Sequence, residues 1–400
     1  QSLGRLADAA PCYRGALQLK PDFATAHNNL GNVLKEQGRL EDALASFRRA
    51  AQARPDYHVA RSNLLGTLTF TNHSHTIYQD EARRFDQMAS NGPKPFSVWH
   101  CEDEPGRLHV GIVSGDLRNH SVGHFLEGML EHIDPERVEL YAYPTHHQTD
   151  ELSAWIRPRF AAWTALFGRS DEAAARAIHK DGVHILLDLS GHFAHNRLPV
   201  FAWRPAPVQA TWLGYLASTG MKAMDYLIAD AWTLPATEEA KFTERIWRLP
   251  ETYVCLKAPT VSAPVSRLPA LDNGHVTFGS FNNLTKMGDA VVSTWARVLA
   301  SIPGSRLFLK TGQLGEPPLR LKTMARFAAH GIDASRLTLE GPIPERNDHL
   351  AAYDRIDIAL DPFPYPGVTT TAESLWMGVP VLTLCGESFL SRQGVGLLSN

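Results

Sequence analysis

Three consecutive threonines, Thr369–Thr371, begin an expected helix in the stretch "DPFPYPGVTTTAESLWMGVPV", directly after the apolar segment "RIDIALD". The first N–H groups of a helix have no partner inside it, and together with the helix dipole they attract anions. Capping such a helix needs one hydroxyl, and Gly367 lets the backbone approach a ligand closely. A diphosphate, which has several acceptor oxygens, would use the hydroxyls that capping leaves over. The residues alone leave an ordinary N-cap and a phosphate site both open.

Two further polar groups are expected at strand ends near this helix. Glu373 lies four residues after Thr369, where a carboxylate either complements the helix dipole or accepts a hydrogen bond from a ribose hydroxyl. In "SFNNLTKM", Asn283 and Lys286 follow another expected strand, and the Lys286 ammonium suits a phosphate as a point charge. A solvated lysine fits the same pattern, so this loop is a candidate rather than an established site.

Histidines provide candidates for acid–base chemistry. His120, in "GDLRNHSVGHF", follows the first expected strand and sits on a loop, whereas His184, in "DGVHILLDLSGH", starts a strand and fits a structural role equally well. His120 and His124 are four residues apart without the adjacent glutamate of the zinc-protease pattern, so no metal site is expected. The chain also lacks the Walker and dinucleotide-binding glycine motifs, which removes the main support for a kinase, an ATPase or an ordinary dehydrogenase.

Composition indicates an ordinary folded protein of two or three domains. The chain has 400 residues, 44% of them hydrophobic and 20% charged, with a formal net charge of -3. That balance gives no support for a nucleic-acid or membrane partner, and no run of about 18 apolar residues is present. Neither zinc spacing nor disulfide density is seen in the four scattered cysteines, so a reducing cytoplasm is expected. The start without Met suggests that a preceding part of a longer protein is missing.

A repeat of 34 positions occupies the first part of the chain. "GRLADAAPCYRGALQLKPD" recurs as "GRLEDALASFRRAAQARPD", and the matched positions are glycine, alanine, an aromatic residue, alanine and proline. The matching pairs are Gly4 with Gly38, Ala9 with Ala43, Tyr13 with Phe47, Ala16 with Ala50, and Pro21 with Pro55. This spacing resembles the tetratricopeptide repeat, in which small residues let two helices approach and the aromatic fills the gap.

After the repeats, strands and helices alternate. "RLHVGIVSGDL", "VELYAYP" and "HILLDLSGH" read as strands separated by helices, and a second series runs from "HVTFGSFNNLTK" to "VPVLTL". Such alternation predicts α/β domains with parallel sheets, which bind ligands at the carboxyl ends of their strands. The expected domains are repeats at 1–70, a helical linker at 71–105, and α/β domains at 106–265 and 266–400. We expect the site to lie in the cleft between the last two.

The order of motifs resembles a known enzyme family. "GDLRNHSVGHF", "RPAPVQATWLGYLASTG", "MDYLIAD", "SFNNLTK" and "GVTTTAESLWMGVPVLTL" follow the repeats as in the O-linked N-acetylglucosamine transferases, most closely their bacterial SPINDLY-like relatives. The resemblance implies a GT-B fold with two Rossmann-like domains. It also implies an inverting, metal-independent transfer from a nucleotide sugar to Ser or Thr, without a cofactor, and repeats that present the protein acceptor.

The resemblance also implies roles for individual residues. Lys286 would hold the donor diphosphate, Thr369, Thr370 and the helix after them would bind it, and Glu373 would contact the ribose. The remaining matches are His120 beside the acceptor, Arg346 and His349 around the base, Asn283 beside the lysine, and the flexible loop "GYLASTG" with Tyr215 and Thr219 near the sugar. His184 is a further candidate on the sugar or acceptor side.

Some positions depart from the animal transferases, and alternatives stay open. Val368 stands where those enzymes have histidine, and Asn283 where they have glutamine. UDP-N-acetylglucosamine is the first expected donor, and GDP-fucose is the second because SPINDLY members can transfer fucose. A nucleotide-binding repeat module without turnover is a third possibility. A glycan hydrolase would need two carboxylates, and Asp116, Asp188 and Asp361 all lie near expected strand ends.

Overall fold

The computed structural model describes residues 6–71, 73–258 and 265–400. By contacts these residues form two compact units, one of residues 6–50, 70–71 and 265–400, the other of residues 51–69 and 73–258. Each unit therefore combines helices of the repeat region with one α/β sheet. The boundaries expected from the sequence stay predictions. No helix in the described ranges is long and apolar enough to cross a membrane.

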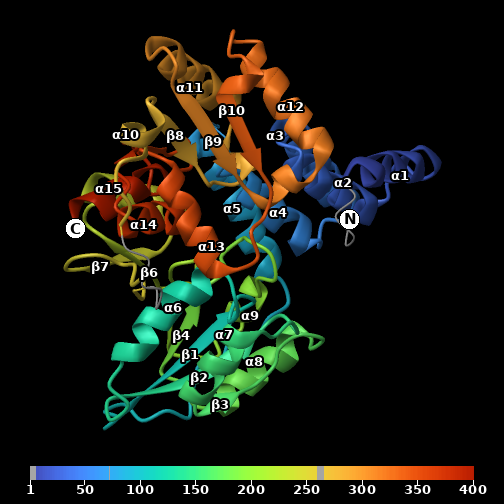
Figure 1. Cartoon of the computed structure of the whole chain (residues 1–400). Helices are drawn as coiled ribbons and strands as arrows, with labels where there is room; N and C mark the ends of the chain where they lie inside the picture. The colour runs from blue at the N-terminus through green and yellow to red at the C-terminus, as the bar shows by residue number, and fades with distance from the viewer. Residues whose placement is uncertain (1–5, 72, 259–264) are drawn as a thin grey trace. The chain divides into compact units, whose positions relative to one another are not determined.

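The repeat region is helical in the predicted register. Its helices, coloured blue in Figure 1, are α1 (Leu6–Leu19), α2 (Ala24–Glu36), α3 (Leu40–Ala53), α4 (His58–Leu68) and α5 (His75–Ala89). The bounds of α1 and α3 differ by 34 positions, as the repeat requires. A Cβ built on Gly31 would lie 2.5 Å from the Phe47 ring, so the aromatic does fill the space that glycine leaves. Gly4, the first glycine of the repeat, lies outside the described residues.

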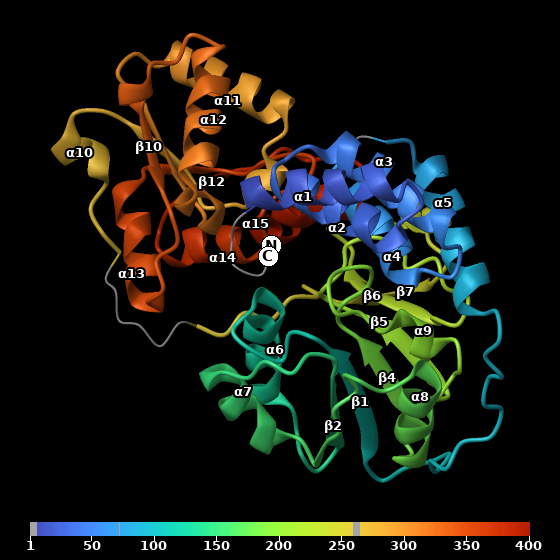
Figure 2. The same cartoon turned by 90° about the vertical axis from the view of Figure 1, so that its right-hand side faces the viewer.

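The unit with residues 73–258 contains a seven-stranded parallel sheet in the order β3-β2-β1-β4-β5-β6-β7. Its strands are β1 (Leu108–Ser114), β2 (Val138–Pro144), β3 (Ala162–Trp163), β4 (Ile185–Asp188), β5 (Val208–Thr211), β6 (Tyr226–Asp230) and β7 (Arg245–Leu249). Its other helices are α6 (Ser121–His132), α7 (Glu151–Ile156), α8 (Asp171–Lys180) and α9 (Leu198–Phe201). Figure 2 shows β1, β2 and β4 side by side, with α6 and α7 to one side and α8 and α9 to the other.

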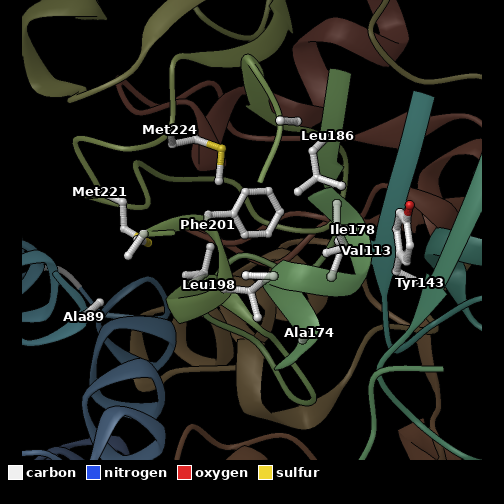
Figure 3. Packing of buried hydrophobic residues seen from close by; sticks show 14 of the residues in the cluster. Ala89, Val113, Tyr143, Ala174, Ile178, Leu186, Leu198, Phe201, Met221 and Met224 are labelled. Atoms are coloured by element: carbon white, nitrogen blue, oxygen red, sulfur yellow. The ribbon is translucent and has the colours of Figure 1, made fainter. Parts of the chain in front are cut away.

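A hydrophobic core lies between this sheet and α8, α9 and α5 (Figure 3). Val113 and Leu186 come from neighbouring strands, and Ile178 and Phe201 pack on them from α8 and α9. All four side chains are at most 1% exposed. The sheet is thus covered and rigid, and the polar groups at its carboxyl edge are mounted on a fixed support.

The other unit contains a five-stranded parallel sheet in the order β10-β9-β8-β11-β12. Its strands are β8 (Thr277–Ser280), β9 (Arg306–Lys310), β10 (Leu337–Glu340), β11 (Ile358–Leu360) and β12 (Val381–Leu382). Its helices beyond the repeats are α10 (Pro269–Asn273), α11 (Asp289–Ser301), α12 (Pro317–Ala328), α13 (Arg346–Ala351), α14 (Thr369–Trp376) and α15 (Gln393–Ser399). Figure 1 shows α11 and α12 beside β8, β9 and β10.

Both faces of this second sheet are buried. Alternation along β9 sends Leu307 and Leu309 into the core under α11 and α12, and Phe308 into a second core with Leu350 of α13. The sequence prediction of α/β architecture is therefore confirmed in both units, and its weakness was in the short strands. β3, β5, β6 and β7 were not recognised because they are brief and carry little alternation.

Candidate functional site

A buried aspartate organises the elbow that precedes α14. Asp361 follows β11, and its carboxylate accepts hydrogen bonds from the Gly367 N–H (3.2 Å) and the Thr371 hydroxyl (3.1 Å). A Cβ on Gly367 would lie 2.2 Å from Thr370 Oγ1 and 3.0 Å from Asp361 Oδ1. Glycine is therefore required by close approach. Thr371, one of the three predicted hydroxyls, is directed to the elbow itself.

Lys286 points into the same elbow. Its Nζ lies 2.9 Å from the carbonyl oxygen of Pro366, 3.2 Å from Asn282 Oδ1, and 4.3 Å from the centre of the Tyr365 ring. Burial lowers the pKa of Lys286 to about 8, and the negative charge of Asp361 acts in the opposite direction. Lys286 is partly buried, and at neutral pH its ammonium remains mostly protonated.

The lysine and the threonines are brought together through a residue that the sequence did not single out. Asn282 is 6% exposed, and its Oδ1 accepts from both Lys286 Nζ and the Thr370 hydroxyl, the latter at 3.3 Å. The predicted Asn283 is exposed, and its side chain instead caps the 3₁₀ turn Leu284–Lys286 by accepting from the Thr285 N–H. The double asparagine was a visible signal, but sequence does not tell which of the two faces Lys286.

Thr369 begins α14 and leaves its hydroxyl available. Val368 occupies the N-cap position, where its apolar side chain caps nothing. Within the described ranges Thr369 forms no side-chain hydrogen bond, whereas Thr370 contacts Asn282 and Thr371 contacts Asp361. The three predicted hydroxyls thus divide into one that is available, one beside Lys286 and one that is structural.

Glu373 is buried on α14 and collects three donors from the region around α13. Its carboxylate accepts from Arg346 Nη1 (3.1 Å), His349 Nε2 (3.2 Å) and the Tyr353 hydroxyl (3.2 Å). Burial raises the pKa of Glu373, but the hydrogen bond from His349 and the charge of Arg346 outweigh it, so the pKa is lowered. The predicted trio of Arg346, His349 and Glu373 is therefore one network.

Lys310 at the end of β9 extends this network. Its Nζ lies 2.5 Å from His349 Nδ1, which makes Nδ1 the acceptor and leaves Nε2 to donate to Glu373. Burial lowers the pKa of Lys310. Sequence reasoning missed both Lys310 and Tyr353; the lysine that ends the strand "SRLFLK" was the available signal.

In the other unit, His120 follows β1 and caps α6. Its Nδ1 accepts from the Val122 N–H at 3.3 Å and lies 3.6 Å from Asp116 Oδ2. Burial lowers the pKa of His120, Asp116 raises it, and Arg118 lowers it. At neutral pH the ring is therefore neutral, with Nδ1 as acceptor and the proton on Nε2. Its outer nitrogen is a hydrogen-bond donor in this tautomer.

Asp188 at the end of β4 is fully buried and held by neutral donors. Its oxygens accept from the N–H groups of Ser190 (3.2 Å) and Gly191 (2.8 Å) and from the Thr211 hydroxyl (2.9 Å). Burial raises the pKa of Asp188 to about 6 despite these bonds. From the sequence, Asp188 was noted only as an aspartate near a strand end, and nothing there indicated which groups would donate hydrogen bonds to it.

Three predicted residues of this unit lie in internal contacts. The Tyr215 hydroxyl is 2.6 Å from that of Tyr78 on α5, and Thr219 is fully buried with its N–H donating to Glu244 at 2.7 Å. His184 accepts from the His109 N–H at the amino edge of the sheet, whereas His120 follows the carboxyl end of β1. The structure thus does not bring His184 to the edge that carries His120.

Searching the described residues finds no group of three or more His, Cys, Asp or Glu side chains arranged to hold a metal ion. Three histidines do gather beyond the carboxyl ends of the first sheet, where the His146 and His195 rings are 4.1 Å apart and those of His146 and His147 are 4.5 Å apart. Burial lowers the pKa of both His146 and His195, so these rings are neutral at neutral pH.

Comparison with known proteins decides the family. Residues 84–258 and 261–399 match the family described as Glycosyl transferase family 41, and residues 1–58 match the tetratricopeptide repeat. The chain belongs to glycosyl transferase family 41. This confirms the resemblance found in the sequence, including the repeats.

Relatives of this family 41 chain include SPINDLY proteins of Petunia hybrida and Arabidopsis thaliana, each named as a probable UDP-N-acetylglucosamine–peptide N-acetylglucosaminyltransferase. They are 38% and 37% identical to it over 76% of this chain, which covers 33% and 34% of their own length. The chain thus spans about a third of the curated relatives that it matches.

A solved structure of a Thermobaculum terrenum O-GlcNAc transferase mutant is also similar. It is 36% identical, with a TM-score of 0.93, and the match covers 100% of this chain and 76% of that one. Together with the two parallel sheets, this likeness confirms the predicted GT-B architecture of two Rossmann-like domains behind tetratricopeptide helices.

Proposed function

We propose that this family 41 protein transfers N-acetylglucosamine from UDP-N-acetylglucosamine to Ser or Thr hydroxyls of proteins. The observation that carries the proposal is the Lys286 ammonium, which is held between Asn282 and the Pro366 carbonyl at the elbow before α14. A partly desolvated cation beside a helix start suits the phosphate that gains charge as the nucleotide leaves.

On the donor side, Lys286 and the free N–H groups of α14 would bind the diphosphate, with the Thr369 hydroxyl as a further donor. The Thr370 hydroxyl would join them by turning from Asn282 Oδ1 to a phosphate oxygen. Because Lys286 is only weakly solvated, its interaction with a phosphate is stronger than it would be in water. This positive potential is the basis for proposing a transfer that uses no metal and no cofactor, and the family resemblance is the basis for proposing that it inverts the sugar configuration. The diphosphate would replace the Pro366 carbonyl as a partner of Lys286.

We place the nucleoside near the network of Arg346, His349 and Glu373. Three donors already occupy the Glu373 carboxylate, so its first function is to orient Arg346 and His349, and a ribose hydroxyl would take the remaining acceptor position. Lys310 fixes the tautomer of His349 from the other side. Asn283, exposed at the turn beside Lys286, would lie at the rim of this site.

On the acceptor side we propose His120 as a hydrogen-bond donor rather than a general base. Its Nδ1 accepts from the Val122 N–H, so its neutral ring offers Nε2–H and has no free nitrogen lone pair. Tyr215 and Thr219 would support the nearby loop from inside. We leave His184 out of the proposed site because of its place at the amino edge of the sheet.

The related SPINDLY proteins are named for transfer from UDP-N-acetylglucosamine, so the GDP-fucose alternative is not favoured. The acidic pair needed for a glycan hydrolase also finds no support, because Asp188 and Asp361 each hold a turn within their own unit. Presentation of acceptor proteins through the tetratricopeptide helices, and a cytoplasmic location, remain part of the proposal.

The test is transfer of radiolabelled sugar from each donor to proteins of a bacterial lysate. We expect label from UDP-N-acetylglucosamine on Ser or Thr, and a loss of about 10²- to 10³-fold in rate in Lys286→Ala, the usual effect of removing one transition-state donor. Lys222→Ala, which removes an exposed lysine of the other unit, is the matched control and should keep the rate.

Other outcomes identify other functions. Label from GDP-fucose alone would make the protein a fucosyltransferase. Tight UDP binding without transfer to any protein would indicate a binding module. Release of free sugar from glycans at a rate that Lys286→Ala leaves unchanged would contradict the proposal altogether, because no leaving nucleotide would then be involved.

A further inference from the structure

The turn that carries Lys286 is anchored from outside the site by Gln313. Gln313 belongs to the 3₁₀ turn Gly312–Gly315 after β9, and its Oε1 accepts from the Leu284 N–H at 2.7 Å. Its Nε2 also donates to the hydroxyl of Thr285 at 3.3 Å. Leu284 and Thr285 are the two residues directly before Lys286, so one amide group holds the backbone that aims the ammonium.

The same amide group reaches the end of a repeat helix. Gln313 Nε2 lies 3.0 Å from the Glu36 carbonyl oxygen, on the last residue of α2. The Thr285 hydroxyl, 3.4 Å from the Lys35 carbonyl, is the second link to this helix end. The last carbonyls of a helix have no partner inside it and so readily accept such donors. α2 and the turn Leu284–Lys286 are therefore joined through Gln313 within one compact unit.

Chemistry fixes which way this amide faces. An N–H of the main chain only donates, so the Leu284 N–H requires the Gln313 oxygen. The amide nitrogen must then face α2, where the Glu36 carbonyl only accepts. Neighbouring Leu314 is fully buried in the core under α11 and α12, which fixes the backbone from which the Gln313 side chain extends. A glutamate at this position would satisfy Leu284 but set a carboxylate oxygen against the Glu36 carbonyl.

We propose that Gln313 is a positioning residue, which braces the turn Leu284–Lys286 against repeat helix α2 and thereby keeps the Lys286 ammonium on the donor diphosphate. The inference rests on the proposed function, since it assigns the diphosphate to Lys286. It adds that donor affinity depends on a contact with the tetratricopeptide helices, although α2 itself supplies no group to the donor.

The first test uses hydrogen exchange on the whole chain to measure the hydrogen bond between the Leu284 N–H and Gln313. In Gln313→Ala the Leu284 N–H loses its acceptor, so we expect its exchange to become at least about tenfold faster, the worth of roughly one hydrogen bond. Unchanged exchange at Leu284 would overturn the inference without reference to any ligand.

The second test is UDP affinity by calorimetry in a double-mutant cycle. Gln313→Ala should weaken UDP binding about tenfold, and the same change in a Lys286→Ala background should weaken it much less, because Gln313 acts through Lys286. Gln313→Glu should also weaken binding, since glutamate keeps the acceptor for the Leu284 N–H but loses the donor to the Glu36 carbonyl. Equal losses in both backgrounds would show a merely structural role and overturn the inference.

Lys322→Ala is the matched control. Lys322 donates to the Gln37 carbonyl at 2.7 Å, so it contacts the same end of α2 without touching the turn Leu284–Lys286. UDP affinity should stay within about twofold in this variant. A loss as large as that of Gln313→Ala would mean that docking of α2 in general, and not the brace, is what matters. A wild-type chain that binds no UDP would refute the proposed function, and with it the positioning role, even if Leu284 exchanges as expected.

Discussion

In each of the two sheets, a buried aspartate at the end of an interior strand accepts hydrogen bonds from a glycine N–H and a threonine hydroxyl. Asp188 follows this pattern at the end of β4, where it accepts from the Gly191 N–H and the Thr211 hydroxyl. Asp361 follows it after β11, where it accepts from the Gly367 N–H and the Thr371 hydroxyl. In both turns burial raises the pKa of the carboxyl group. The aspartate, glycine and threonine therefore shape a strand-end turn in either unit.

The difference between the two turns is a cation. The charge of Lys286 lowers the pKa of Asp361, whereas the N–H groups and the hydroxyl that donate to Asp188 are neutral and the charge of Glu244 raises its pKa further. The turn by itself is thus a scaffold, and the lysine beside it gives the elbow before α14 an attraction for anions. A substitution in one turn can therefore be compared with the equivalent substitution in the other.

Alanine at the two glycines should give the largest effect and separate scaffold from site. Gly191 has a φ of +50°, and its Cβ would lie 2.1 Å from Tyr215 Cβ, so Gly191→Ala should lower the free energy of unfolding by about 3 kcal/mol. Gly367→Ala meets the Thr370 hydroxyl, which can rotate, and should cost about 2 kcal/mol. Urea denaturation measures both.

UDP binding completes this comparison. Gly367→Ala should weaken it because the added methyl group displaces Thr370 beside Lys286, and Gly191→Ala should not. Equal weakening by both variants would mean that the elbow before α14 is not the specific anion site.

Glu373→Ala tests a buried carboxylate that has cationic partners. We expect a loss of about 2 kcal/mol in the free energy of unfolding, less than for a fully buried pair because Arg346 is 35% exposed. Glu340→Ala, which breaks the more exposed pair with Arg355, is the control and should cost under about 1 kcal/mol.

The pH dependence of this loss has a definite sign. The folded pKa of Glu373 lies below its ordinary value of 4.5, so its contribution is present above that pH and fades as the pH falls through the folded pKa. A difference between wild type and Glu373→Ala that stays constant down to acidic pH would contradict the network.

Asp188→Asn should show the opposite sign and the smallest effect. Folding raises the pKa of Asp188 from 3.8 to about 6, so the folded state binds the proton more tightly and gains stability as the pH falls below about 6. Between pH 7 and pH 5, wild type should gain about 1 kcal/mol relative to the asparagine variant, in unfolding free energies measured at both values. A gain in the reverse direction would mean that a cation compensates Asp188 as Lys286 does Asp361.

Much of the donor side was predictable because its signals are local. The alternation of strands and helices and the polar residues after strands pointed to Lys286, Thr370 and Glu373, and the family resemblance added Arg346 and His349. The structure joins Lys286 to Thr370 through Asn282, and Arg346 and His349 to Glu373. Asn282 and Lys310 were missed because their importance depends on partners more than 20 residues away.

The candidates of the other unit were less predictable. The family resemblance implied a flexible loop at "GYLASTG", but its Tyr215 and Thr219 bond to Tyr78 and Glu244 in the interior. His184 precedes a strand, and only the register of the sheet shows that it stands at the amino edge. Composition cannot distinguish these cases, since burial arises from residues distant in the sequence.

The sequence by itself determined the family, the helical repeats, the two α/β sheets and the strand ends that carry chemistry, because periodicity and turn residues act over a few neighbouring positions. Only the tertiary structure decided which of three threonines faces Lys286, which asparagine supports it, and that Gln313 joins its turn to α2. Those choices depend on donors and acceptors that meet across long stretches of chain, in an interior where each buried polar group requires a partner.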